Sequence, residues 1–296
     1  MKSLIEYIIE SRGIVTNENS WSDLVEYIIK NFKSDKIIIT KNLPPWMNQC
    51  TVKIEDIVYG GLAEYSDRES GRIDNKMNVV INLTKKAVRY PSRLKVILEH
   101  EFQHAFDDWI ARFHRGKYFL SNSYCTSIGY EGPDFDKINF WDIYDNPEKC
   151  YFDHMFYLLR ESSYWFEPTE SNAFLREFGL YIKNYAKTHK IWNWENLYKD
   201  PNNTGAQPLI GIMLIHKVLD EINKYDIDWE YVMRSLNDRW AKSFMGHQFP
   251  GNSKEAFCKV LLEILNNKAE KILLRYRRIL KDSGLKTKNV PYWFKN

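Results

Sequence analysis

The sequence predicts an α+β protein, in which a small mixed β-sheet is followed by a mostly helical C-terminal half. Two observations support this class. Runs of β-branched residues bounded by Pro, Gly, Asn or Asp come first, and apolar residues at helical spacing dominate after them. We expect a helical arm over residues 1–35 and one main domain over residues 36–296, composed of a sheet at 36–84, a first long helix at 91–113 and a helical part at 148–296.

The sheet is predicted from four short segments that are rich in Val, Ile and Thr. A polar stretch, Ser66–Asn75, lies between two of them and has the composition of a long hairpin loop. The four expected strands are Lys36–Thr40, Thr51–Ile54, Ile57–Tyr59 and Met77–Leu83.

The helices are predicted from apolar residues that recur every three or four positions. Pro91 marks the start of the first long helix, because proline is tolerated in the first turn of a helix. Residues 115–147 are rich in Gly, Asp, Asn and Ser, and we expect a long loop that forms a lid or pocket wall. Other helices are expected at 2–11, 21–33, 148–162, 168–188, 207–224, 228–242 and 254–282.

The composition excludes several classes of protein. The chain has 296 residues, of which 44% are hydrophobic and 27% are charged, as in a globular protein and unlike a low-complexity chain. Its four cysteines are far apart in the sequence, which argues against a disulfide scaffold or a thiolate zinc site. We also expect no membrane span, because no apolar run is long enough, and a cytoplasmic location, because the N-terminal stretch carries Glu6 and Glu10 and does not resemble a signal peptide.

The most informative motif is His-Glu-x-x-His, formed by His100, Glu101 and His104 inside the first long helix. Two histidines four positions apart lie roughly 40° from one another around a helix, so both imidazoles reach one metal ion from one face. We expect Glu101 to project next to that metal position.

The same helix separates its apolar residues from this motif. One apolar stripe of this helix is formed by Leu94, Leu98, Phe102, Ala105 and Trp109. The two histidines lie on a different face of the helix, with Asp107 beside them. The helix is therefore expected to bury one side and to line a cleft with the other.

A hydrolytic zinc ion needs a third protein ligand and an open position for water. A third histidine in the compact pattern is excluded, because Asp107 occupies the glycine position and Ile110 the histidine position. A glutamate on a later helix remains, and the best candidate is Glu170, in the first turn of the helix that begins at Pro168. Glu167 is the alternative.

Through His100, Glu101, His104 and the pair Glu170 and Ala173, the chain resembles the HExxH zinc metallopeptidases of the gluzincin type, within the zincin superfamily. The resemblance covers residues 77–180. It implies a zincin-like fold, with 91–113 as the active-site helix, a Zn²⁺ cofactor, a peptide or protein substrate, and Glu101 as the general base. It also implies that the strand Asn78–Leu83 is the edge strand along which an extended peptide lies.

Other site residues remain open under this resemblance. Thermolysin-like members have an aspartate four residues after the ligand glutamate, where this chain has Phe174. Asp107 or Asp108 is the candidate carboxylate that orients a metal-bound histidine in its place. Tyr164 and His216 are candidates for the group that stabilises the oxyanion.

Two further interpretations follow from the sequence. The chain could keep a zincin-like fold and its metal as a structural or interaction protein without turnover, because a fold does not fix a function. The C-terminal stretch from Lys268 to Asn296 has nine positive and two negative residues. This basic end either binds nucleic acid, another acidic partner or a membrane surface, or is the solvated face of a terminal helix.

Overall fold

The fold is given by a computed structural model, which describes residues 18–57, 62–67, 69–89, 91–115, 155, 158, 164–166, 168–200, 203–225, 227–240 and 251–294. The chain divides into two compact units, Met1–Ser121 and Asn122–Asn296. The first contains a mixed sheet with helices, and the second is mostly helical, so the α+β class is confirmed.

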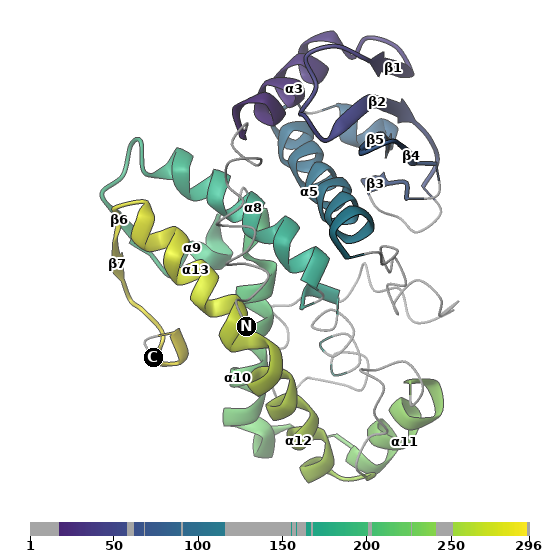
Figure 1. Cartoon of the computed structure of the whole chain (residues 1–296). Coiled ribbons are helices and arrows are strands. Elements are labelled where there is room, and N and C mark those ends of the chain that lie inside the picture. The colour runs from purple at the N-terminus through teal and green to yellow at the C-terminus, as the bar shows by residue number, and fades with distance from the viewer. Residues whose placement is uncertain are drawn as a thin grey trace. The chain divides into compact units, whose positions relative to one another are not determined.

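The sheet of the first unit has five strands: β1 (Lys36–Ile39), β2 (Met47–Ile54), β3 (Ala63–Tyr65), β4 (Gly71–Ile73) and β5 (Lys76–Leu83). Their order is β1-β2-β5-β3, and β4 also pairs with β5. The β2–β5 pair is parallel and the others are antiparallel, which makes the sheet mixed, as predicted (Figure 1).

The position of β5 corrects the prediction that Asn78–Leu83 is the edge strand. β5 pairs with β2 on one side and with β3 and β4 on the other, so it lies inside the sheet. Its residues Val79–Leu83 are all buried, as expected for an interior strand whose two faces are both covered. Among the described strands, β3 and not β5 ends the sheet on this side.

Three helices complete the described part of this unit: α3 (Glu18–Asn31), α4 (Lys85–Val88) and α5 (Pro91–Arg115). Figure 1 shows α5 running alongside the sheet, with α3 near it. The predicted apolar stripe of α5 is confirmed, because its residues enter one core together with alternate residues of β5 and with one face of α3. This core includes Trp21, Leu24, Val25, Ile28, Met77, Val79, Ile81, Leu83, Leu94, Leu98, Phe102 and Ala105.

The boundaries of the units differ from the predicted domains. We expected a separate arm over residues 1–35, but α3 contributes to the same core as the sheet and α5. We also expected a single domain over 36–296, whereas the division falls between residues 121 and 122. The predicted helix at 2–11 lies outside the described residues, as does most of the helix at 148–162. The loop predicted at 115–147 also lies outside them, except for Arg115, which is the last residue of α5.

The second unit is built from helices with one small parallel ribbon. Its strands β6 (Ile191–Asn193) and β7 (Lys286–Lys288) were not predicted, because three-residue strands carry too short a pattern. The helix expected at 254–282 is interrupted by a π-helical turn, η5 (Leu265–Ala269). The described helices are α8 (Pro168–Tyr185), α9 (Asn196–Lys199), α10 (Gln207–Glu221), α11 (Trp229–Trp240), α12 (Lys254–Ile264) and α13 (Glu270–Asp282), with 3-10 turns η3 (Thr204–Ala206), η4 (Ile222–Lys224) and η6 (Tyr292–Phe294).

Helix α8, which carries Glu170, is held by close contacts inside the second unit. A Cβ added to Gly205 in η3 would lie 2.2 Å from the backbone nitrogen of Phe178 and 2.6 Å from the carbonyl oxygen of Phe174. The Tyr276 hydroxyl of α13 donates to the Gly205 carbonyl oxygen at 2.6 Å. Gly205 therefore lets η3 approach the backbone of α8 more closely than any side chain would allow.

This contact predicts opposite effects for two glycine substitutions. Gly205→Ala should lower the free energy of unfolding by about 1–3 kcal/mol, because the new methyl group would collide with the backbone of α8. Gly179→Ala is the matched control, since nothing lies within 4 Å of a Cβ at this α8 position. It should raise the stability by roughly 0.5–1 kcal/mol. Urea denaturation measures both, and a neutral Gly205→Ala would contradict the close approach.

Candidate metal centre

The histidine pair lies on one face of α5. The Nε2 atoms of His100 and His104 are 3.0 Å apart, and the ring planes are inclined at 77°. His104 is buried and His100 is half-buried. Two imidazoles on a tetrahedral zinc ion have nitrogens about 3.3 Å apart. The pair therefore fits one ion with a small change in the side chains.

Glu101 is buried between α5 and strand β3. Its Oε2 accepts a hydrogen bond of 2.6 Å from the backbone N–H of Tyr65. A hydrogen bond to an ionised carboxylate is stronger than a neutral one, so this contact fixes the Glu101 side chain. The residue expected to be the general base is thus held by the strand at the end of the sheet.

Tyr65 contacts α5 at a second point. Its hydroxyl donates to Oδ2 of Asp108 at 2.6 Å, and Asp108 is fully buried. Glu101 and Asp108 are seven residues apart, which is about two helical turns, so they lie on the same side of α5. Sequence reasoning missed Tyr65, because nothing local distinguishes it among 19 tyrosines.

A third buried carboxyl group on α5 was also missed. Glu99 is fully buried and accepts a hydrogen bond of 3.2 Å from the Ser22 hydroxyl of α3. Burying a carboxylate costs free energy unless donors or cations compensate for the lost hydration. The helix therefore carries Glu99, Glu101 and Asp108 as buried acids close in sequence to the histidine pair.

Asp107, predicted to orient a histidine, is half-buried and accepts a hydrogen bond of 3.0 Å from the Gln103 side chain. Asp108, the alternative, is bonded to Tyr65. The described contacts connect both aspartates to neighbours on or beside α5, and the orienting role of either one stays a prediction.

In the second unit, Glu170 lies in the first turn of α8 and is half-buried, in agreement with the predicted helix start at Pro168. The two residues that follow Glu170 anchor the start of the helix. The Ser171 hydroxyl donates to the carbonyl oxygen of Trp165 at 3.1 Å, and Asn172 Oδ1 accepts from Arg275 of α13 at 2.6 Å. Ala173 is buried, and Glu167, the alternative ligand, lies outside the described residues.

The two oxyanion candidates have packing roles in the second unit. His216 is stacked on Trp293, with ring centroids 5.8 Å apart and planes inclined at 9°. Burial lowers the pKa of His216, against the opposing effect of the nearby Asp220 carboxylate. Tyr164 contacts the ring of Phe174 edge-on at 6.3 Å. These contacts give both side chains a structural explanation.

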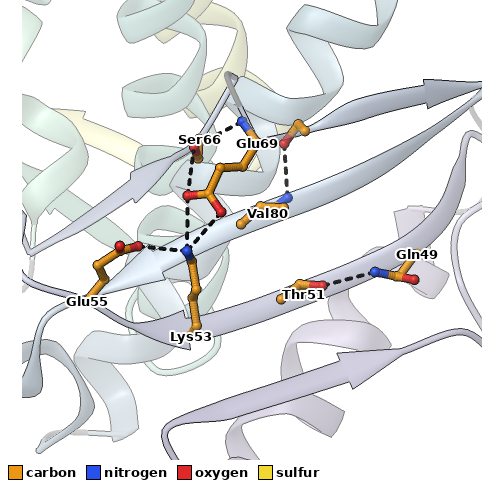
Figure 2. A network of polar contacts seen from close by, with 8 residues as sticks. Gln49, Thr51, Lys53, Glu55, Ser66, Glu69 and Val80 are labelled. Carbon is orange, nitrogen blue, oxygen red and sulfur yellow. Dashed lines mark hydrogen bonds and ion pairs between the residues drawn. The ribbon is translucent and has the colours of Figure 1, made fainter.

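A polar network holds the segment that follows β3 against the sheet (Figure 2). Lys53 of β2 lies 2.8 Å from both Glu55 and Glu69, and the Ser70 hydroxyl accepts a hydrogen bond from the backbone of Val80. Hydrogen bonds to Glu55 and Glu69 raise the pKa of Lys53, and the hydrogen bond from Lys53 lowers the pKa of Glu69. The stretch Ser66–Asn75, predicted as a hairpin loop, contains the short strand β4, and the segment before β4 is tied to β2 and β5.

No protein-family model, curated protein or solved structure matches the chain. Among the described residues, no helix is both long and apolar enough to cross a membrane.

The Tyr65 contact predicts a specific loss of stability. Tyr65→Phe removes the donor to the buried Asp108 carboxylate and should lower the free energy of unfolding by about 1–3 kcal/mol. Tyr27→Phe, at an exposed tyrosine of α3, is the control and should change it by less than about 0.5 kcal/mol. Chemical denaturation measures both variants. Equal stability of the two would show that the hydroxyl of Tyr65 contributes nothing.

Proposed function

We propose that this protein is a zinc-dependent metallopeptidase of the gluzincin type with a zincin-like fold. The observation that carries the proposal is the histidine pair of α5, whose Nε2 atoms lie 3.0 Å apart with Glu101 between them in the sequence. The buried acids of α5 support it, because a divalent cation at the pair would offset part of the cost of burying them.

The proposed ligands are His100, His104 and Glu170. His100 and His104 lie on α5 in the first unit, and Glu170 lies in the first turn of α8 in the second unit. Two imidazoles and one carboxylate are a ligand set of catalytic zinc, with the fourth position left for water. Glu167 remains the alternative to Glu170 as the third ligand.

Glu101 is the proposed general base, which takes a proton from the attacking water and delivers it to the leaving amine. A bound zinc ion would supply a water of lowered pKa and polarise the scissile carbonyl. The hydrogen bond from Tyr65 would orient the Glu101 carboxylate for this transfer.

The strand for an extended peptide is proposed to be β3 and not β5. Ser66 donates its N–H to Val80, and Thr84 donates its N–H to Leu62, so the backbone groups of residues 62 and 66 point toward β5. Backbone direction alternates along a strand, and the groups of Ala63 and Tyr65 therefore point outward. Glu101 binds at this outward edge, which would bring a peptide paired with Ala63 close to the general base.

One observation favours the alternative of a zincin-like structural or interaction protein without turnover. The Tyr65 N–H donates a hydrogen bond to one carboxylate oxygen of Glu101, so this oxygen is already bonded and less able to take a proton from water. In that case the metal would serve stability, and four protein ligands would close the site.

Metal content tests the ligand assignment. The purified protein should contain about one zinc per chain, measured by elemental mass spectrometry. His104→Ala should lose the zinc, because two ligands do not retain it under dialysis. His189→Ala, at an exposed histidine of the second unit, is the control and should keep it. Zinc retained by His104→Ala would place the metal elsewhere.

An assay of peptide hydrolysis distinguishes the metallopeptidase from the structural or interaction protein without turnover. Glu101→Gln should keep the zinc and lower kcat/KM on a peptide library by about 10²–10⁴-fold, because it removes the base and preserves the size of the side chain. Glu26→Gln, at an exposed glutamate of α3, is the matched control and should hydrolyse like the unaltered protein. A zinc-loaded protein that cleaves no peptide would favour the silent alternative.

A further inference from the structure

Five exposed lysines lie in the β6–β7 ribbon or within five residues of it in the sequence. Lys187 and Lys190 lie between α8 and β6, Lys281 lies in the last turn of α13, and Lys286 and Lys288 lie in β7. The parallel register pairs Ile191 with Lys286, and the N–H of Lys286 donates to the carbonyl oxygen of Lys190 at 3.1 Å. Figure 1 shows β6 and β7 side by side. We name these five residues the basic patch.

The basic patch has an excess of positive charge. In the described part of the chain, none of its five ammonium groups forms an ion pair, unlike Lys53, Lys95 and Lys217. The sequence has no acidic residue between positions 178 and 194, and Asp282 is the one acidic residue between positions 278 and 294. Glu195 accepts a hydrogen bond from Asn289, next to Lys288, and Asp282 follows Lys281, so the five lysines outnumber the carboxylates beside them. Like charges repel one another, and a structural role alone does not favour this excess.

Fold stability explains part of the patch. A cation in the last turn of a helix interacts favourably with the helix dipole, which accounts for Lys281. Lysines on an edge strand oppose pairing with another chain, which accounts for Lys286 and Lys288. The dipole of α8 also favours Lys187, which lies two residues after this helix and donates a hydrogen bond to the Asn184 side chain at 3.0 Å. Neither reason applies to Lys190, which directly precedes β6.

An ordered pair of rings lies beside these two lysines. His189 stacks on Tyr185 with ring centroids 3.9 Å apart and planes inclined at 11°, and His189 is exposed. The Tyr185 hydroxyl accepts a hydrogen bond from the Asn196 side chain and donates one to the carbonyl oxygen of Ile191. These two bonds fix the Tyr185 ring, on which His189 is stacked. The exposed His189 ring, held by Tyr185 and close to lysines, is suited to stacking with a nucleic-acid base.

We propose that the basic patch binds single-stranded nucleic acid, with its lysines on the phosphates and a base on His189. The stacked rings favour this partner over an acidic protein. Ile191 is the exposed large apolar side chain of the ribbon, and a membrane surface would require more apolar area than one such residue offers. The proposal goes beyond peptide hydrolysis and depends on residues of the second unit alone.

Fluorescence anisotropy with a labelled oligothymidylate tests the proposal on the full chain. The affinity should fall steeply with salt, and replacing Lys190, Lys286 and Lys288 with Gln should reduce the slope of log K against log salt by about 2. The matched control replaces the exposed Lys33, Lys36 and Lys41 of the first unit with Gln. It changes the net charge equally and should keep the affinity and the slope.

A separate variant tests whether the stacked His189 ring contributes to binding. His189→Ala should weaken binding about fivefold or more without changing the salt slope, because a stacking contact is lost while the phosphate contacts remain. Equal binding by the two triple variants would overturn the proposal. So would preferential binding of polyglutamate or of phosphatidylserine vesicles over the oligonucleotide, since either result would identify a different partner.

Discussion

The proposed centre depends on the pair of hydrogen bonds by which Tyr65 connects β3 to α5. Its backbone N–H and its hydroxyl each bond a buried carboxylate, at 2.6 Å in both cases, and the two carboxylates are two helical turns apart. These bonds satisfy acids that would otherwise lower the stability of the unit. They also fix the strand whose outer edge adjoins Glu101, so one residue couples stability to the geometry of the site.

The main elements of the fold could be predicted because their patterns are long. The 25-residue helix α5 repeats its apolar stripe over many turns, and five of the eight residues of β5 are apolar. Strands β3, β4, β6 and β7 have three residues each, and pairing with neighbours stabilises them more than their own composition does. The interior position of β5 was not predicted, because the strands that pair with its second edge, β3 and β4, are too short to be recognised in the sequence.

The site was predictable where its residues are close in sequence. The spacing of His100 and His104 predicts that both rings reach one position, and the nitrogens do lie 3.0 Å apart. Tyr65 was not predictable, because its contacts join residues 36 and 43 positions apart and depend on how β3 packs against α5. Glu170 was placed correctly in the first turn of its helix by Pro168, whereas its role as a ligand remains a proposal.

The central claim is that both histidines of α5 hold one zinc ion in an open site. X-ray absorption at the zinc edge tests this claim most directly, because it reports the number and type of ligands. The zinc-loaded protein should show four nitrogen or oxygen ligands at about 2.0–2.1 Å, two of them imidazoles, and no sulfur. One imidazole or none, or any thiolate sulfur, would contradict the account.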